Sequence, residues 1–108
     1  MRPGRKALSI YRGTTFRLRV QWSSVSDWTG WEPRVQIRER VASPEAVLEL
    51  TLGSGITIDG DALVLAISAA DTAALGFDSG YWSLEVSQGD DTYRLLEGPV
   101  RVDQEVTR

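Results

Sequence analysis

The sequence predicts a single all-β domain folded as an antiparallel β-sandwich, and three observations lead to this class. Apolar and polar residues alternate with a period of two through most of the chain, as in strands with one buried and one exposed face. Turns rich in glycine and aspartate separate these stretches at short intervals, which favours a sandwich over a parallel sheet. The 108 residues, 42% hydrophobic and 25% charged, are enough for one domain with its own core.

Four stretches of the amino-terminal half are predicted as strands. LSIY (residues 8–11) has apolar residues two positions apart and indicates a short leading strand. TFRLRVQW (15–22) places four apolar side chains on one face, with two arginines and a glutamine on the other. PRVQIRER (33–40) repeats this pattern, and AVLELTL (46–52) turns its leucines inward.

The carboxy-terminal half continues with the same period. ITI (56–58) is a short strand between two turns, and ALVLAIS (62–68) is apolar on both faces, so we expect it to be covered on both sides. YWSLEVS (81–87) and TYRLLEGPVRVD (92–103) are joined by a hairpin loop. The last strand is expected to carry a bulge or an edge at Gly98-Pro99, because proline has no N–H for the sheet.

One segment departs from the period of two. In SAADTAALG, Ser68 precedes Asp71 by three positions, and this spacing predicts a capped helical turn near residues 69–75 that ends at Gly76. The expected architecture is therefore seven or eight short strands with one helical turn over residues 8–108, after a flexible arm over residues 1–7.

The composition excludes several kinds of chemistry. The chain contains no cysteine and no histidine, which removes disulfides, thiolate metal ligands and the commonest general base. No apolar run approaches the about 20 residues of a membrane helix, and the amino end lacks the apolar core of a signal peptide. We expect a protein made in the cytoplasm, with no membrane partner.

Carboxylate pairs do not predict an active site. Asp59 with Asp61, and Asp90 with Asp91, lie in predicted turns, where aspartate is favoured for local hydrogen bonds. A glycosidase needs two carboxylates across a cleft, and adjacent turn residues do not provide that geometry. We therefore expect no enzyme, no catalytic residue, no cofactor and no metal site, with adventitious calcium at these turns left open.

Charge is distributed unevenly along the chain. Residues 1–40 hold nine Lys and Arg against three Asp and Glu, and residues 41–108 hold three Arg against twelve Asp and Glu. In the favoured interpretation, basic and acidic strands lie side by side and neutralise each other. In the alternative, a basic face and an acidic remainder steer copies of the chain into a head-to-tail ring or lattice.

The outward arginines of residues 15–22 and 33–40 are expected to form one basic stripe, which the amino-terminal arm extends. Phosphate binding would need the stripe to stay uncovered, and no outward aromatic side chains lie between the arginines to stack on bases. Nucleic acid is therefore not an expected partner, and contact with other protein subunits is. The basic candidates for such an interface are Arg2, Arg5, Lys6, Arg17, Arg19, Arg38 and Arg40.

Tryptophans supply the remaining candidates. Trp22 and Trp82 fall on the inward face of their strands and are predicted to lie in the core. Trp28 and Trp31 flank a Thr-Gly step, where they either plug the end of the sandwich or anchor a neighbouring protein. Burial is favoured for Trp28 and both alternatives stay open for Trp31, so both residues are interface candidates, as is Tyr11.

Five stretches occur in one order: YRGTTFRLRVQW, WTGWEPRVQIRER, LELTLGSGITIDG, LVLAISAADTAAL and GYWSLEVSQGDDTYRLLEGPVRVDQEVTR. Together they resemble a family of small phage and prophage virion proteins with an immunoglobulin-like β-sandwich. The family includes collar proteins that anchor side tail fibres and amino-terminal domains of some baseplate proteins. The resemblance covers residues 8–108, and tryptophan at positions 28 and 31 replaces the smaller apolar or tyrosine residues expected there.

This resemblance implies a non-enzymatic structural protein located in a tailed-phage virion. It implies an adaptor at the tail, collar or baseplate that contacts other virion proteins and copies of itself. A capsid decoration protein is the alternative within virions. A carbohydrate- or protein-binding module, with the tryptophans as its platform, is the alternative outside them.

Overall fold

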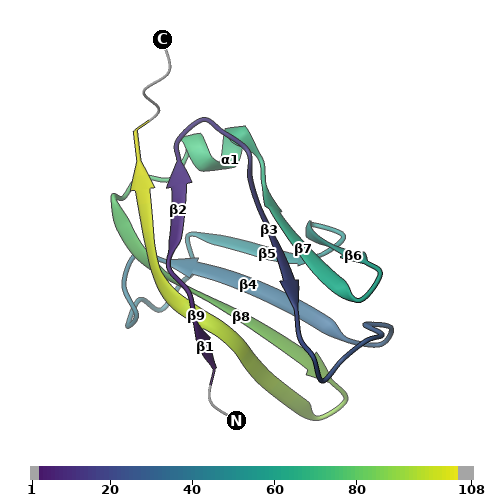
Figure 1. Ribbon diagram of the computed structural model, residues 1–108. Coiled ribbons are helices and arrows are strands. Elements are labelled where there is room, and N and C mark those ends of the chain that lie inside the picture. Colours follow the sequence, from purple (N-terminus) through teal and green to yellow (C-terminus); the bar gives the residue numbers. More distant parts are fainter. Residues whose placement is uncertain (1–2, 105–108) are drawn as a thin grey trace.

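The computed structural model describes residues 3–104, which form nine strands and one short helix (Figure 1). The elements are β1 (Gly4–Arg5), β2 (Leu8–Tyr11), β3 (Phe16–Gln21), β4 (Glu32–Arg38), β5 (Leu48–Leu52), β6 (Gly55–Asp59), β7 (Ala62–Ile67), α1 (Ala69–Ala73), β8 (Ser79–Gln88) and β9 (Asp91–Asp103). All eight predicted strands are confirmed, with small shifts at their ends, and β1 is an addition. Within the described range, no helix has the length and apolar character needed to cross a membrane.

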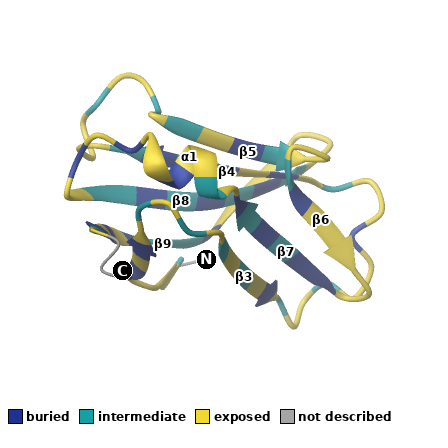
Figure 2. Ribbon diagram, turned by 90° about the horizontal axis from the view of Figure 1, so that it is seen from above, coloured by how far each residue is buried: buried dark blue, intermediate teal, exposed yellow. Residues whose placement is uncertain are grey.

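The strands follow one hydrogen-bonded order, β1-β9-β8-β4-β5-β6-β7-β3, with β2 also paired to β9. The sheet folds over between β5 and β6. A small layer of β3, β7 and β6 thereby stands opposite a large layer of β5, β4, β8 and β9 (Figure 2). Gly55 lies at this corner with a φ of 101°, a conformation that favours glycine. The arrangement is an immunoglobulin-like sandwich, so the predicted fold class is confirmed.

The amino-terminal strands both run parallel to β9. Gly4 is paired with Leu96, and after a short break Leu8 is paired with Val100. Within that break the Lys6 N–H donates to the Glu97 carbonyl at 3.0 Å. Residues 4–6 are therefore held on the sheet, and the expected flexible arm over residues 1–7 is wrong for them. The edge of β9 supplies the partners that their backbone groups need.

The irregularity of β9 lies away from its predicted place. The register of β8 and β9 shifts between Leu84 and Glu85, so the extra residue of the bulge is Leu95 rather than Gly98 or Pro99. Pro99 falls in the gap between the registers of β1 and β2. Its missing N–H therefore leaves no hydrogen bond of the sheet unmade.

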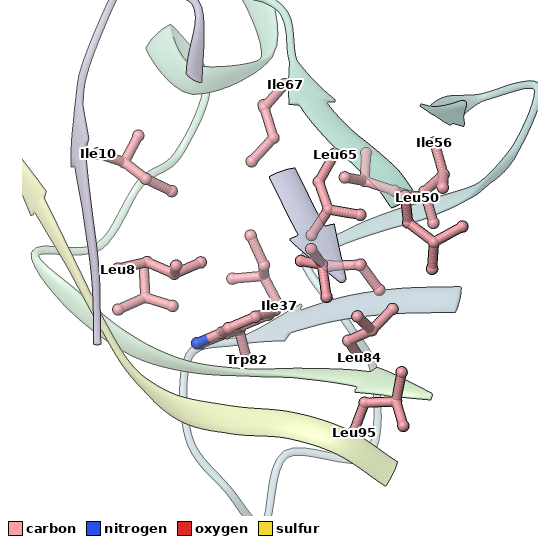
Figure 3. Packing of buried hydrophobic residues seen from close by; sticks show 14 of the residues in the cluster. Leu8, Ile10, Ile37, Leu50, Ile56, Leu65, Ile67, Trp82, Leu84 and Leu95 are labelled. Atoms are coloured by element: carbon pink, nitrogen blue, oxygen red, sulfur yellow. The ribbon is translucent and has the colours of Figure 1, made fainter. Parts of the chain in front are cut away.

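Side chains from both layers meet in one apolar core. Figure 3 shows Leu8 and Ile10 of β2, Leu65 and Ile67 of β7, and Ile37, Trp82 and Leu84 of the large layer directed into the same interior. Trp82 is 1% exposed, which confirms its predicted place in the core. Trp22 is only half-buried, because it follows β3, the last strand of the sheet. The prediction that Trp22 lies fully in the core is therefore wrong, since the ring only packs against the core from its rim.

The predicted helical turn is confirmed as α1. The Ser68 hydroxyl accepts a hydrogen bond from the Asp71 N–H at 3.1 Å, as the capping pattern indicates. The helix ends with Ala74 as its C-cap rather than at Gly76. Just beyond it, Arg12 donates to the Leu75 carbonyl at 3.0 Å. Arg12, which follows β2, thus contacts the segment that follows α1, and this contact holds the two segments together at this end of the sandwich.

The close approach of the amino-terminal segment to β9 predicts a sharp difference between two glycines. A Cβ at Gly98 would lie 2.2 Å from the Lys6 carbonyl oxygen, whereas a Cβ at Gly76 would meet nothing within 4 Å. Gly98→Ala is expected to lower the free energy of unfolding by about 1–3 kcal/mol, and Gly76→Ala is expected to leave it nearly unchanged. Chemical denaturation measures both variants, and equal effects would contradict this packing.

Candidate interaction surface

Three tryptophans and a tyrosine pack together at the end of the sandwich where the β3–β4 loop meets the start of β9. The ring centroid of Trp22 lies 6.3 Å from that of Trp28, 6.1 Å from that of Trp31 and 5.8 Å from that of Tyr93. Trp31 lies 5.9 Å from Trp28 and 6.2 Å from Tyr93. Tilted and edge-to-face pairs at such distances are mutually attractive. We call these four residues the aromatic cluster.

Trp28 is the innermost member of the aromatic cluster. It is 1% exposed, and its indole N–H donates to the Asp61 carbonyl at 3.0 Å, which ties the β3–β4 loop to the β6–β7 turn. The Trp31 N–H donates to the Trp28 carbonyl at 3.0 Å across a turn in which Gly30 has a φ of 85°. The favoured prediction of burial is confirmed. Trp28 cannot contact a partner directly, which corrects its place among the interface candidates.

Asp27 stabilises this turn from outside. Its carboxylate accepts a hydrogen bond from the Thr29 N–H at 3.0 Å, and the hydrogen bonds to Thr29 lower the pKa of Asp27. Because the folded pKa is depressed, the stabilisation is present above the unfolded pKa and is lost as the pH falls through the folded pKa. The turn is therefore held at neutral pH.

The other three members of the aromatic cluster reach the surface. Trp31 is half-buried, so it plugs the end of the sandwich and still presents part of its ring to solvent. Tyr93 is 36% exposed and was not predicted as a site residue. Tyr93 is paired with the inward-facing Val86, and it takes the inner face because the bulge at Leu95 reverses the alternation of β9. The sequence feature that could have indicated this bulge is the pair of adjacent leucines, Leu95 and Leu96, which interrupts the alternation of apolar and polar residues.

A groove with a volume of about 460 Å³ adjoins the aromatic cluster, between β3 on one side and β1 and β9 on the other. Its apolar lining consists of Leu18, Val20, Trp22, Leu95 and Leu96, its polar lining consists of Lys6, Arg19 and Gln21, and Gly4 completes it. Trp22 belongs to both the cluster and the groove. The two features therefore form one continuous surface, which we call the cluster–groove surface.

The predicted basic stripe does not form. Arg17 and Arg19 lie on the outer face of β3, and Arg34 and Arg38 lie on the outer face of β4. β3 and β4 belong to opposite layers, so the two rows of arginines point in opposite directions. Alternation fixes the face that a residue takes on its own strand, but it does not fix which strands are neighbours.

Several of the basic candidates are engaged within the chain. Arg19 forms an ion pair with Asp59 at 2.6 Å, Arg5 approaches Glu97 at 3.6 Å, and Arg38 donates to the Ser43 carbonyl at 3.0 Å. The pair of Arg5 and Glu97 joins the adjacent strands β1 and β9, as the favoured interpretation expects. Arg19 reaches Asp59 from the far side of β7, and Arg38 bonds a neutral carbonyl. Three basic candidates are exposed and have no ion pair within residues 3–104: Lys6, Arg17 and Arg40. Tyr11 is 50% exposed at the end of β2. Arg2 lies outside the described residues.

The carboxylate pairs lie at turns: Asp61 and Asp90 are turn residues, as predicted, and Asp59 and Asp91 are the adjoining end residues of β6 and β9. Asp59 and Asp61 bracket the β6–β7 turn, and Asp90 and Asp91 stand in the β8–β9 hairpin. Asp61 accepts a hydrogen bond from the Gln21 side chain at 2.9 Å. Among the residues that the structure describes, no group of three or more Asp and Glu is arranged to hold a metal ion.

Comparison with known proteins gives likenesses to solved structures alone. No protein family model matches the chain, and no curated protein matches it. One solved structure that matches comes from work on parallel homodimers of the extracellular domains of the voltage-gated sodium channel beta4 subunit, and on their role in cell-cell adhesion. It shares 12% sequence identity over 98% of this chain and 97% of that chain, with a TM-score of 0.49.

The depth of each tryptophan predicts its contribution to stability. Trp28→Phe is expected to lower the free energy of unfolding by about 2 kcal/mol, because it removes a hydrogen bond and leaves a small void. Trp31→Phe makes the same chemical change at a half-buried ring, and we expect less than about 1 kcal/mol. Urea denaturation compares the two variants. A larger loss for Trp31→Phe would contradict the arrangement of the cluster.

Proposed function

We propose that this chain is a non-enzymatic structural protein of a tailed-phage virion, an adaptor at the tail, collar or baseplate that joins fibres or neighbouring subunits. The sequence resemblance supports the viral setting. One observation supports the mode of action: the partly exposed rings of Trp22, Trp31 and Tyr93 are continuous with the apolar groove.

Such a surface is suited to hold another protein. Aromatic side chains supply large contact areas, and tryptophan and tyrosine are enriched among the residues that dominate binding free energy. Here the rings of Trp22, Trp31 and Tyr93 each pack against the other two, and both tryptophans also pack against the core. Little conformational entropy would therefore be lost when a partner binds, because these side chains are already ordered.

The placement of charge supports protein partners rather than nucleic acid or substrate. The two rows of arginines lie on opposite layers, so they offer no continuous track for a phosphate backbone. Asp59 and Asp61 are engaged by Arg19 and Gln21 at the surface instead of facing each other across a cleft. In a ring or lattice of copies, the exposed arginines of the two outer faces would serve as contacts and set the orientation of neighbours.

A carbohydrate-binding module is the second candidate, favoured by the same partly exposed rings at a loop end of the sandwich. A glycan titration that quenches tryptophan fluorescence would support that module over the adaptor. The alternative of a capsid decoration protein has no separate support in the structure.

Two exposed tyrosines test whether the cluster–groove surface binds the partner. Tyr93 lies near the start of β9, and Tyr11 of β2 lies beside the end of β9. Tyr93→Ala is expected to lower the amount of protein that co-sediments with phage particles at least about tenfold, in line with loss of an interface hot spot. Tyr11→Ala removes a more exposed ring, 50% against 36%, which lies on β2 beside Asp103, and it serves as the control. Loss of association in Tyr11→Ala alone would place the contact at the other end of the sandwich.

The number of copies per particle separates the viral alternatives. A collar or baseplate ring would hold on the order of a dozen copies, and a decorated head lattice would hold hundreds, since closed rings have few subunits. Quantitative gel analysis of purified particles measures this number. Absence of the protein from the particles would contradict both alternatives.

A further inference from the structure

β3 is a free edge of the sheet. It ends the order of hydrogen-bonded strands and is paired only with β7, from Phe16 opposite Ile67 to Gln21 opposite Ala62. The amino-terminal strands lie on β9, so among the described residues no strand covers the other side of β3. About half of its backbone N–H and C=O groups therefore point away from β7 and have no strand partner.

Paired residues show the effect of this open edge on packing. Phe16 and Leu18 are half-buried, whereas their partners Ile67 and Leu65 are each 2% exposed. Both members of each pair face the same interior. The difference arises because β7 has a strand on each side and β3 has a strand on one side only.

The apolar groove runs beside the same edge. Leu18, Val20 and Trp22 line one side of it, and Leu95 and Leu96 line the other. Successive side chains of a strand point to opposite faces. A strand added to β3 would therefore direct every second side chain into this groove, where apolar residues are required.

The remaining side chains of an added strand would face outward, beside Arg17 and Arg19. Lys6 lines the same groove from the opposite side. Arg19 is paired with Asp59, and Asp61 accepts a hydrogen bond from Gln21, whereas Arg17 and Lys6 have no ion pair within residues 3–104. The positive charge left uncompensated along this edge is therefore that of Arg17 and Lys6. Opposite charges stabilise neighbouring positions on adjacent strands, and the edge therefore favours acidic residues on the outward face of an added strand.

We propose that β3 accepts an extended segment of a partner protein by strand addition, and that apolar and acidic residues alternate in this segment. The inference rests on the proposed adaptor function and specifies how the adaptor binds.

A second copy of β3 is a poor occupant of this edge. Antiparallel pairing of two β3 edges would bring the arginine rows of the two copies together, and Arg17, which has no ion pair within residues 3–104, would meet a like charge, which is destabilising. Arg17 therefore disfavours self-pairing and favours an acidic strand.

A synthetic peptide tests the proposal directly. The probe is a peptide of about seven residues in which glutamate alternates with valine, with both ends blocked. Its addition is expected to shift the amide NMR signals of residues 16–22 and to leave those of β4 unchanged. A peptide with lysine in place of glutamate is expected to bind about tenfold more weakly. Absence of binding, or equal binding of the two peptides, would overturn the proposal.

Variants that reverse the charge beside β3 test whether this charge selects the peptide. The double variant Lys6→Glu, Arg17→Glu is expected to bind the glutamate peptide about tenfold more weakly and to bind the lysine peptide more tightly. Arg40→Glu changes an exposed arginine away from the groove and is expected to bind both peptides as the unchanged protein does. Circular dichroism verifies that each variant is folded. Unchanged affinities in the double variant would count against selection by charge.

Two further outcomes separate this inference from the adaptor function. A concentration-dependent dimer in which the amides of β3 shift without peptide would make a second copy the occupant and overturn the proposal. Association with phage particles without peptide binding would also overturn strand addition, while leaving the adaptor function in place. Peptide binding without particle association would retain strand addition and reject the viral setting.

Discussion

The backbone carbonyl of Lys6 accepts a hydrogen bond from the buried indole of Trp82 at 2.8 Å, and the rest of the structure depends on the position that this contact gives to the amino-terminal segment. The segment lies over Gly98, the residue whose missing side chain makes room for it. β1 and β2 are thereby held parallel to β9 on the large layer. The same chain cannot also cover β3, so the small layer keeps an open edge and the interior beside it stays accessible.

A second irregularity shapes the neighbouring end of the sandwich. The bulge at Leu95 shifts the alternation of β9, so that Tyr93 joins the inner face and meets Trp22 and Trp31. Trp28 closes the interior beneath these rings through its hydrogen bond to the Asp61 carbonyl. The result is a packed apolar surface beside a free strand edge. An interaction protein with no requirement for catalytic groups can use both features together.

The period of two was sufficient to predict the fold class and eight of the nine strands described here, because each strand carries its own buried face in its sequence. β1 was not predicted, since two residues show no alternation. The neighbours of each strand were not predictable in this way, and the arginines of β3 and β4 were therefore wrongly combined into one stripe. Burial of Trp28 was the favoured of two alternatives at the turn, and Tyr93 was missed because its face depends on the bulge at Leu95.

Hydrogen exchange measured residue by residue on the isolated monomer tests the central claim most directly, namely that the amino-terminal strands lie on β9 and leave β3 open. Amides of residues 8–11 and of β9 should exchange slowly. Within residues 16–21, amides bonded to β7 should be slow and should alternate with fast ones that face the open edge. Slow exchange at every amide of residues 16–21, or fast exchange throughout residues 8–11, would contradict the account.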